Sequence, residues 1–508
     1  MPLRPFNREQ PWLLPPTLGE LIPNDHPARF VAEFVDAIDG TSWIELEIGL
    51  DGEPLGAPAY HPRALLSVWL YGFMTGIRSS RKLEAACRDQ VPFLWLTTWQ
   101  HPDHNTLWRF YQAHRHTMRK LLKYTVATAI EMELIDLAMQ AVDGTKIAAN
   151  AAGDRNYDRV GLRRLLERIE SAIDQLEAQN EGGDDPPPPR LPEQLQQAQA
   201  LRQRVRDAMN HLAREEKPSR INLTDKDAQL MKARSGFITG YNAQTVVSPL
   251  VNSNRILITA TTVVNTASDH GQLVPMLEVA EENTGKRVGL TLADGGYHTA
   301  ANLEAGEKRK QVLVMAERYQ EESKAPYFKD RFEYDTSTDS YNCPHGQRLP
   351  FRGLRNSPIS GLRSIRVYQA SRTACHRCPA WGTCTKDAHA GRALWIGPSD
   401  LLLRKQRRWM STDKARRLYA RRKELSEPIF GIIKDQMGAR KFLLRGLANV
   451  PAEFNLIAVA FNIRTLYQIW KRKESETAQI ISKRISNIVM SQFGLFELIL
   501  TRQARTYF

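Results

Sequence analysis

Cysteine is scarce in this sequence, with five residues in a chain of 508. That number is too small for a disulfide-stabilised scaffold, and it fits a reducing cytoplasm. Long apolar runs are also lacking. The most apolar stretches, LLSVWLYGFMTGI (65–77) and LIAVAFNI (456–463), are too short to span a bilayer. The first residues, MPLRPFNREQPW, contain no apolar core of a signal peptide. We therefore expect a cytoplasmic protein that has no membrane partner.

Acidic residues are also comparatively few: 56 against 70 basic residues, a net charge of +14. This balance favours a polyanionic partner, nucleic acid first, although a merely basic soluble protein would show it too. The densest basic segment, residues 404–423, has ten Lys or Arg residues and one acid, and Trp409 and Tyr419 interrupt it. Bases with interleaved aromatics suit a nucleic-acid backbone, whereas a solvated helix usually balances its charges. The residues of this run that we expect to contact DNA include Arg404, Arg407, Arg408 and Lys423.

The chain is long enough for more than one domain, or for one core with large insertions. Residues 1–135 read as a helical domain. Its basic break, RSSRK (78–82), is followed by a helix that Asp103 or Asn105 can cap and whose polar face carries Arg109. A DNA-binding helix-turn-helix and a packed helical domain with a solvated face both fit this pattern.

From about residue 136 the pattern changes to short apolar runs that are typical of strands, with a helical stretch between two of them. The runs are LIDLAMQAVD (134–143), GYNAQTVVSPLV (240–251), RILITATTVV (255–264), RVGLTLADGGY (287–297) and KQVLVMAE (310–317), and the helical stretch is HGQLVPMLEVAEEN (270–283). Strands that alternate with helices predict an α/β sheet that is partly parallel. We therefore predict an α/β catalytic domain over residues 136–470, followed by a tail over 471–508.

Two segments interrupt this domain. Residues 158–216 have two amphipathic patterns joined by a Pro- and Gly-rich loop, which predicts a helical hairpin. Residues 320–400 are rich in Cys, Gly and Pro and have weak periodicity.

Four of the five cysteines lie in the second of these segments. They are Cys343, Cys375, Cys378 and Cys384, so that one single cysteine precedes a Cys-x2-Cys-x5-Cys pattern. Four thiolates are sufficient for tetrahedral structural Zn²⁺, and His345 or His376 could replace one of them. Reduced free cysteines are the alternative. Cys87 lies in an apolar helical pattern and is expected in the core.

Three acids are candidates for chemistry. Asp143 and Asp294 each stand where an apolar strand is expected to end, so both would meet at one edge of the sheet. Such oxygen ligands suit Mg²⁺ or Mn²⁺, although an aspartate before glycine often only favours a turn. Glu427 precedes Pro428, which predicts the first turn of a helix, and Lys434 follows on the same face. A surface ion pair between Glu427 and Lys434 is the alternative.

Several motifs together resemble one known family. They are HPRALLSVWLYGFMTGIRSSRKLE (61–84), HPDHNTLWRF (101–110), AVDGTKIAAN (141–150), DKDAQLMKARSGFITGYNAQTVV (225–247), DHGQLVPML (269–277), LADGGYHT (292–299) and YARRKELSEPIFGIIK (419–434). Their order and types resemble a bacterial insertion-sequence transposase of the DDE class, which has a ribonuclease H-like core. The resemblance covers about residues 20–470.

This resemblance implies that Asp143, Asp294 and Glu427 bind two Mg²⁺ or Mn²⁺ ions. The implied reaction is hydrolysis at the ends of the element, followed by attack of a freed 3′-hydroxyl on target DNA. The implied partners are the terminal inverted repeats and the target DNA, bound by a homodimer in the bacterial cytoplasm. The residues expected to hold phosphate are Tyr419, Arg422, Lys423, Lys434 and, after its Gly-Thr turn, Lys146.

The sequence departs from the family pattern in one place. Four residues separate Arg422 from Glu427, where the family often has three. Glu424 is a competing acid, but it lacks the Pro-Ile-Phe-Gly context of Glu427. His298 follows Asp294 by four residues, and we expect it to be structural. Two other functions remain open: an inactive, transposase-derived DNA-binding protein, and a nuclease that cleaves DNA without joining it.

Overall fold

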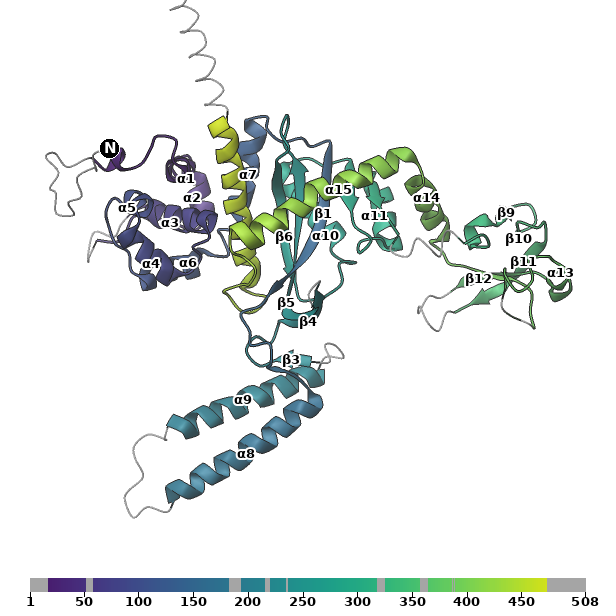
Figure 1. Ribbon diagram of the computed structural model, residues 1–508, viewed down its shortest axis with the longest axis horizontal. Helices are drawn as coiled ribbons and strands as arrows, with labels where there is room; N and C mark the ends of the chain where they lie inside the picture. Colours follow the sequence, from purple (N-terminus) through teal and green to yellow (C-terminus); the bar gives the residue numbers. More distant parts are fainter. Residues whose placement is uncertain are drawn as a thin grey trace, which may run out of the picture.

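The computed structural model describes residues 17–51, 58–181, 193–214, 220–233, 236–317, 325–356, 364–385, 387 and 389–472. A mixed sheet lies at the centre of the molecule (Figure 1). The N-terminal helices lie on one side of it, a second and smaller sheet lies on the other, and a helical hairpin projects from one end. The prediction of a mixed α/β protein with a helical N-terminal region is therefore confirmed.

The central sheet has six strands. They are β1 (Met139–Ala148), β4 (Gln229–Ala233), β5 (Gly236–Pro249), β6 (Ile256–Val264), β7 (Leu290–Ala293) and β8 (Val312–Met315). The order is β4-β5-β1-β7-β8, and β6 also pairs with β5. β1 is antiparallel to β5 and parallel to β7, and β7 is parallel to β8. Each of the five predicted apolar runs overlaps one of these strands, whereas the sequence does not predict β4.

Alternate residues of β1 pack against different helical layers. Ala141 belongs to a cluster with α15 (Asp413–Gly431) and a helix over residues 450–472. Val142 belongs to a cluster with α10 (Leu273–Thr284). Because side chains alternate along a strand, the odd-numbered residues of β1 share the face that α15 covers.

The N-terminal helices share a core with the sheet. They are η1 (Leu18–Leu21), α1 (Pro27–Asp36), α2 (Gly40–Glu45), α3 (Pro62–Thr75), α4 (Ser80–Asp89), α5 (Val91–Leu96), α6 (His104–His114) and α7 (Lys120–Glu131). Asp103 caps α6, as expected, and accepts a 2.6 Å bond from the Thr106 amide. One apolar cluster runs from Trp69 in α3 and the buried Cys87 in α4 to Phe461 in the 450–472 helix.

A buried ion pair joins the N-terminal helices to the end of the chain. Arg78 lies between α3 and α4, and its Nη1 is 2.9 Å from Oε1 of Glu453. The two side chains are 6% and 2% exposed. Arg78 also donates to the carbonyl oxygens of Gly438 and Lys441, and Glu453 accepts from the amide of Leu443. One base of the RSSRK break therefore has an internal role.

The segment over 158–216 contains two antiparallel helices, α8 (Arg159–Glu181) and α9 (Glu193–Arg214). They pack through a core of their own that includes Leu162 and Val205. The short strands β2 (Asn156–Asp158) and β3 (Arg220–Asn222) pair at the base. The hairpin extends away from the central sheet (Figure 1).

The Cys-containing segment forms a second, antiparallel sheet of five strands. They are β9 (Glu333–Asp335), β10 (Ser340–Asn342), β11 (Arg348–Arg355), β12 (Ile365–Gln369) and β13 (Ala393–Ile396), in the order β13-β12-β11-β10-β9. α11 (Ala300–Arg309) and η2 (Lys329–Arg331) precede it, and α13 (Arg372–His376) lies within it. The sequence did not predict these strands, because they are short and have little apolar alternation.

The prediction that a helix starts at Glu427 is wrong. After α14 (Asp400–Met410), Thr412 caps α15 by accepting a 3.2 Å bond from the Ala415 amide, so α15 begins fourteen residues before Glu427. Pro428 therefore lies inside the helix. A π-helix, η3 (Ile432–Gln436), follows directly and carries Lys434.

Among the described helices, none combines the length and the apolar character that crossing a bilayer requires.

Gly240 allows β1 and β5 to approach closely. A Cβ atom at this position would overlap the carbonyl oxygen of Ile147 and lie 3.0 Å from its carbonyl carbon. We predict that Gly240→Ala lowers the free energy of unfolding by about 1–3 kcal/mol, measured by chemical denaturation. Gly289→Ala is the matched control, because a Cβ atom there meets nothing within 4 Å. Equal stability of the two variants would contradict the prediction.

Arg78→Met would leave the Glu453 carboxylate buried without its cation. We predict a loss of about 3–5 kcal/mol of stability, seen as a lower thermal midpoint. Arg88→Met is the control: Arg88 pairs with Glu84 at 2.7 Å, but its side chain is 57% exposed, so we expect under about 1 kcal/mol. A loss for Arg78→Met as small as that of the control would show that the pair does not hold the helices in place.

Candidate functional site

Asp143 and Asp294 lie side by side where the pairing of β1 with β7 ends. The last parallel pair is Val142 with Ala293, and each aspartate is the next residue in its own chain segment. Asp294 follows the end of β7, as predicted. The prediction that Asp143 ends its strand is wrong, because β1 continues to Ala148 through its pairing with β5. Both carboxylates follow residues that face the α10 layer, so both belong to the face that α15 covers.

The carboxylate of Asp143 is largely buried, with a side chain that is 16% exposed. Burial raises its pKa, and the neighbouring Asp294 raises that pKa as well. Hydrogen bonding by Ser426 and by the Gly144 amide, together with the charge of Arg422, lowers the pKa and only partly offsets the burial. Two acids thus lie together with one guanidinium nearby, and a bound cation would stabilise this arrangement further.

The face of α15 that covers the acids presents Tyr419, Arg422 and Ser426. Arg422 Nη1 is 3.2 Å from Oδ2 of Asp143, and its guanidinium lies 5.6 Å from the centre of the Tyr419 ring. The structure therefore brings Tyr419 and Arg422 to the two aspartates.

Glu427 is exposed, whereas the preceding residue Ser426 is buried against Asp143. Glu424 is exposed on the same helix. Within the described ranges, no three His, Cys, Asp or Glu side chains are placed so that they could hold one metal ion. The structure thus juxtaposes two of the three expected acids and leaves Glu427 at the rim.

The two expected lysines have protein partners. Lys434 in η3 donates to Oγ1 of Thr145 at 2.6 Å, two residues after Asp143 and on the same face of β1. Lys146 turns to the other face, where its Nζ is 3.6 Å from Oδ1 of Asp269. Burial lowers the pKa of Lys146, and Asp269 raises it. Lys434 thus reaches β1 two residues from Asp143 through Thr145, and Lys146 follows Asp143 by three residues in the same strand.

Asp269 is a residue of this site that sequence reasoning missed. Its Oδ1 accepts bonds of 2.6 Å from Asn242 and 2.8 Å from Gln244 in β5. A Cβ atom on Gly296 would lie 3.0 Å from Oδ2 of Asp269 and 2.9 Å from Oδ1 of Asp294. Both carboxylates therefore adjoin the same glycine. The one signal in the sequence was an isolated acid between β6 and α10, and its partners come from another strand.

The basic run divides between α14 and α15, and several of its members pair within the protein. Arg407 binds Asp330, with Nη2 2.8 Å from Oδ1, and Arg404 donates to the carbonyl oxygen of the same residue. Arg408 and Lys423 are exposed, as is Arg109 in α6. A carboxylate from a distant segment therefore neutralises the charge of Arg407, and a backbone carbonyl oxygen holds Arg404. Their assignment to DNA binding stays a prediction.

A groove opens next to Tyr419, and neither Asp143 nor Asp294 is among its lining residues. His298, Tyr419, Arg408 and Arg416 are among the residues that line it. Burial lowers the pKa of His298, which favours a neutral imidazole in this position. The groove extends from His298, which follows β7, to the exposed bases of α14 and α15.

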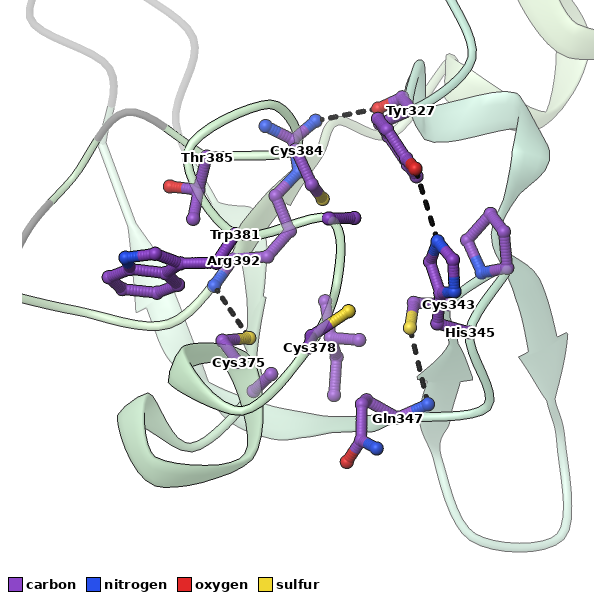
Figure 2. Close-up of a pocket in the computed structure, with 14 residues that line it drawn as sticks. Tyr327, Cys343, His345, Gln347, Cys375, Cys378, Trp381, Cys384, Thr385 and Arg392 are labelled. Carbon is purple, nitrogen blue, oxygen red and sulfur yellow. Dashed lines mark hydrogen bonds between the residues drawn. The ribbon is translucent and has the colours of Figure 1, made fainter.

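The four cysteines of the second sheet line a different pocket (Figure 2). It lies in the small core of that sheet, and it shares no lining residue with the groove next to Tyr419.

Two family models match the chain. The model described as "Transposase domain (DUF772)" matches residues 16–113, which hold most of the N-terminal helices. The model described as "Transposase DDE domain" matches residues 342–467, from the second sheet through α15 to the 450–472 helix. These matches identify transposase domains at both ends of the described chain. Together they support an insertion-sequence transposase of the DDE class. Comparisons with curated proteins and with solved structures give no match.

The tight fit at Gly296 predicts that its substitution disturbs the acids. In Gly296→Ala the Cβ atom would force Asp294 and Asp269 to move, and displacements near 1 Å can reduce activity about a hundredfold. We expect a loss of that order in a cellular transposition assay, with little change in the thermal midpoint. Gly271→Ala in the neighbouring loop is the control, because a Cβ atom there meets nothing within 4 Å. Full activity of Gly296→Ala would refute the packing argument.

Proposed function

We propose that the protein binds the terminal inverted repeats of an insertion sequence, cleaves DNA at the element's ends by metal-assisted hydrolysis, and joins the 3′-hydroxyl ends to target DNA. The family gives the class of reaction. The single observation that supports the proposed site is that Asp143 and Asp294 are adjacent at the end of the β1–β7 pairing. We infer that the central sheet is a ribonuclease H-like core over residues 136–470, interrupted by insertions at 158–216 and 320–400.

The residues present fit a hard divalent cation. Two carboxylates adjoin each other, and the raised pKa of Asp143 reflects too little opposing charge for its burial. Carboxylate oxygens are the ligands that Mg²⁺ and Mn²⁺ prefer. In this proposal Asp143, Asp294 and Glu427 would hold two ions, which would activate the attacking hydroxyl and stabilise the leaving oxygen. The exposure of Glu427 leaves its carboxylate accessible to ions and DNA.

The residues around the acids are suited to hold the DNA strand. Arg422 presents a planar guanidinium beside Asp143 and near the ring of Tyr419, where it can donate to phosphate oxygens. Lys434 donates to Thr145, which lies on the same face of β1 as Asp143. We propose that these three side chains position the scissile phosphate, and that Lys146 supports the site from the opposite face.

The DNA flanking the cleavage point would follow the exposed bases. Arg408 lines the groove next to Tyr419, and Lys423 is exposed on α15. Arg109 is exposed on α6, so we propose that the N-terminal helices contribute to binding the terminal repeat. Phosphate contacts of this kind give affinity without base specificity.

Joining two element ends calls for two active sites, so we propose a homodimer on DNA. The hairpin of α8 and α9 has its own core and projects from the sheet, which makes it a candidate contact between copies (Figure 1). We place the protein in the bacterial cytoplasm, at the nucleoid when it is bound to DNA.

The decisive experiment incubates purified protein with Mg²⁺ and DNA that carries the terminal inverted repeats. We expect the wild type to cleave the ends and join them to target DNA. Asp143→Ala, Asp294→Ala and Glu427→Ala should reduce both steps below detection while DNA binding persists, because each removes a ligand of the reacting ions. The products are separated on denaturing gels.

Glu424→Ala is the matched control, since Glu424 is an exposed acid on the same helix. It should keep nearly full activity. If Glu427→Ala stays active while Asp269→Ala does not, the third acid has been assigned wrongly. Cleavage without joining would indicate a nuclease, and binding without cleavage in any divalent metal would indicate an inactive DNA-binding derivative.

A further inference from the structure

The second sheet gathers the four cysteines of the Cys-containing segment from three places in the chain. Cys343 directly follows β10, Cys375 lies in α13 and Cys378 just after it, and Cys384 lies in the following loop. All four line one pocket, and their side chains approach a common space (Figure 2). Each is a free thiol. The fold thus brings together four cysteines that are spread over residues 343–384.

Backbone amides point at two of the sulfur atoms. The amide of Gln347 donates to Sγ of Cys343 at 3.2 Å, and the amide of Arg392 donates to Sγ of Cys375 at 3.4 Å. The first belongs to a tight turn closed by a 2.8 Å bond from the Gly346 amide to the Cys343 carbonyl, with Gly346 at a φ of 75°. Amide donors of this kind stabilise the negative charge of a thiolate that binds metal.

A positive charge also lies at the pocket. Arg392 is among the residues that line it, and its guanidinium is held by a 3.0 Å bond to the Tyr327 carbonyl. A guanidinium near cysteines stabilises their thiolate form.

His345 and His376, the two possible replacements for a thiolate, have other contacts, and the third histidine of the segment, His389, does not line the pocket. His345 Nε2 is 3.1 Å from the hydroxyl of Tyr327. The ring of His376 lies 5.3 Å from that of Trp381. These contacts leave the four thiols as the ligand set, rather than three thiols and an imidazole.

We propose that Cys343, Cys375, Cys378 and Cys384 bind one Zn²⁺ ion in a closed tetrahedral site. The present spacing of the sulfur atoms does not place three of them to hold one ion. On binding, the thiols would release their protons and move inward from their positions around the pocket. Four protein ligands leave no position for substrate, so the site is structural. Its effect is to fasten the turn after β10 to α13, in a sheet whose own apolar core is small.

Zinc content of the full-length protein tests this proposal. After purification under reducing conditions, we expect one zinc per chain by mass spectrometry of the metal. Cobalt substitution should give the intense visible bands of tetrahedral Co²⁺ with the near-ultraviolet charge transfer of several thiolates. Cys375→Ser and Cys384→Ser should lose zinc and become more sensitive to proteolysis within residues 325–400.

Cys87→Ser is the matched control, because Cys87 is buried in the other core and should leave zinc content unchanged. If the serine variants fail to fold, the cobalt spectrum of the wild type still decides the question. A zinc-free wild type whose four thiols react freely with Ellman's reagent, or are paired as disulfides, overturns the proposal. Asp143→Ala should retain its zinc, so this test is independent of the proposed transposition chemistry.

Discussion

The register between β1 and β7 is the constraint on which the candidate site depends. Val142 and Ala293 form the last parallel pair, and the next residue in each segment is an aspartate. Because side chains alternate along a strand, a slip of one residue would turn one carboxylate towards the α10 layer. The contact of the acids with each other does not favour this arrangement, since Asp294 raises the pKa of Asp143. The backbone hydrogen bonds of the central sheet therefore hold together two groups that repel, and α15 covers them with Arg422, which offsets part of that repulsion.

Buried polar contacts likewise fix the N-terminal helices to the rest of the protein. Arg78 and Glu453 are almost completely buried and bond to backbone groups as well as to each other. Asn462 in the 450–472 helix bonds both the amide and the carbonyl of Ile258 in β6, and it donates to Thr125 in α7. A buried polar network with satisfied partners fixes one relative arrangement of the parts it joins. If the N-terminal helices bind a terminal repeat, as proposed, this network would keep the bound DNA at a constant distance from the acids.

The sequence predicted the parts of this fold that depend on local pattern. The apolar runs of the central sheet and the cap at Asp103 depend on periodicity and on one side chain, and both are present. The prediction for the start of α15 is wrong, because Thr412 already caps this helix and Pro428 lies inside it. The sequence does not reveal the role of Asp269, because its partners lie on β5 and β1, far from it in the chain. The strands of the second sheet lack the continuous apolar runs that mark the central sheet.

The net charge of the chain does not reveal which of its bases are free to bind a partner. The net charge of +14 pointed to nucleic acid, yet several bases of the 404–423 run are used inside the protein. Arg407 pairs with Asp330, which no spacing in the sequence reveals, and Arg422 pairs with Asp143. Arg408 and Arg416 remain exposed and line the groove. If DNA follows this groove, as proposed, a localised positive charge would attract it there more selectively than the same charge spread over the surface. The paired arginines fix α14 and α15, and these helices then hold the exposed ones in place.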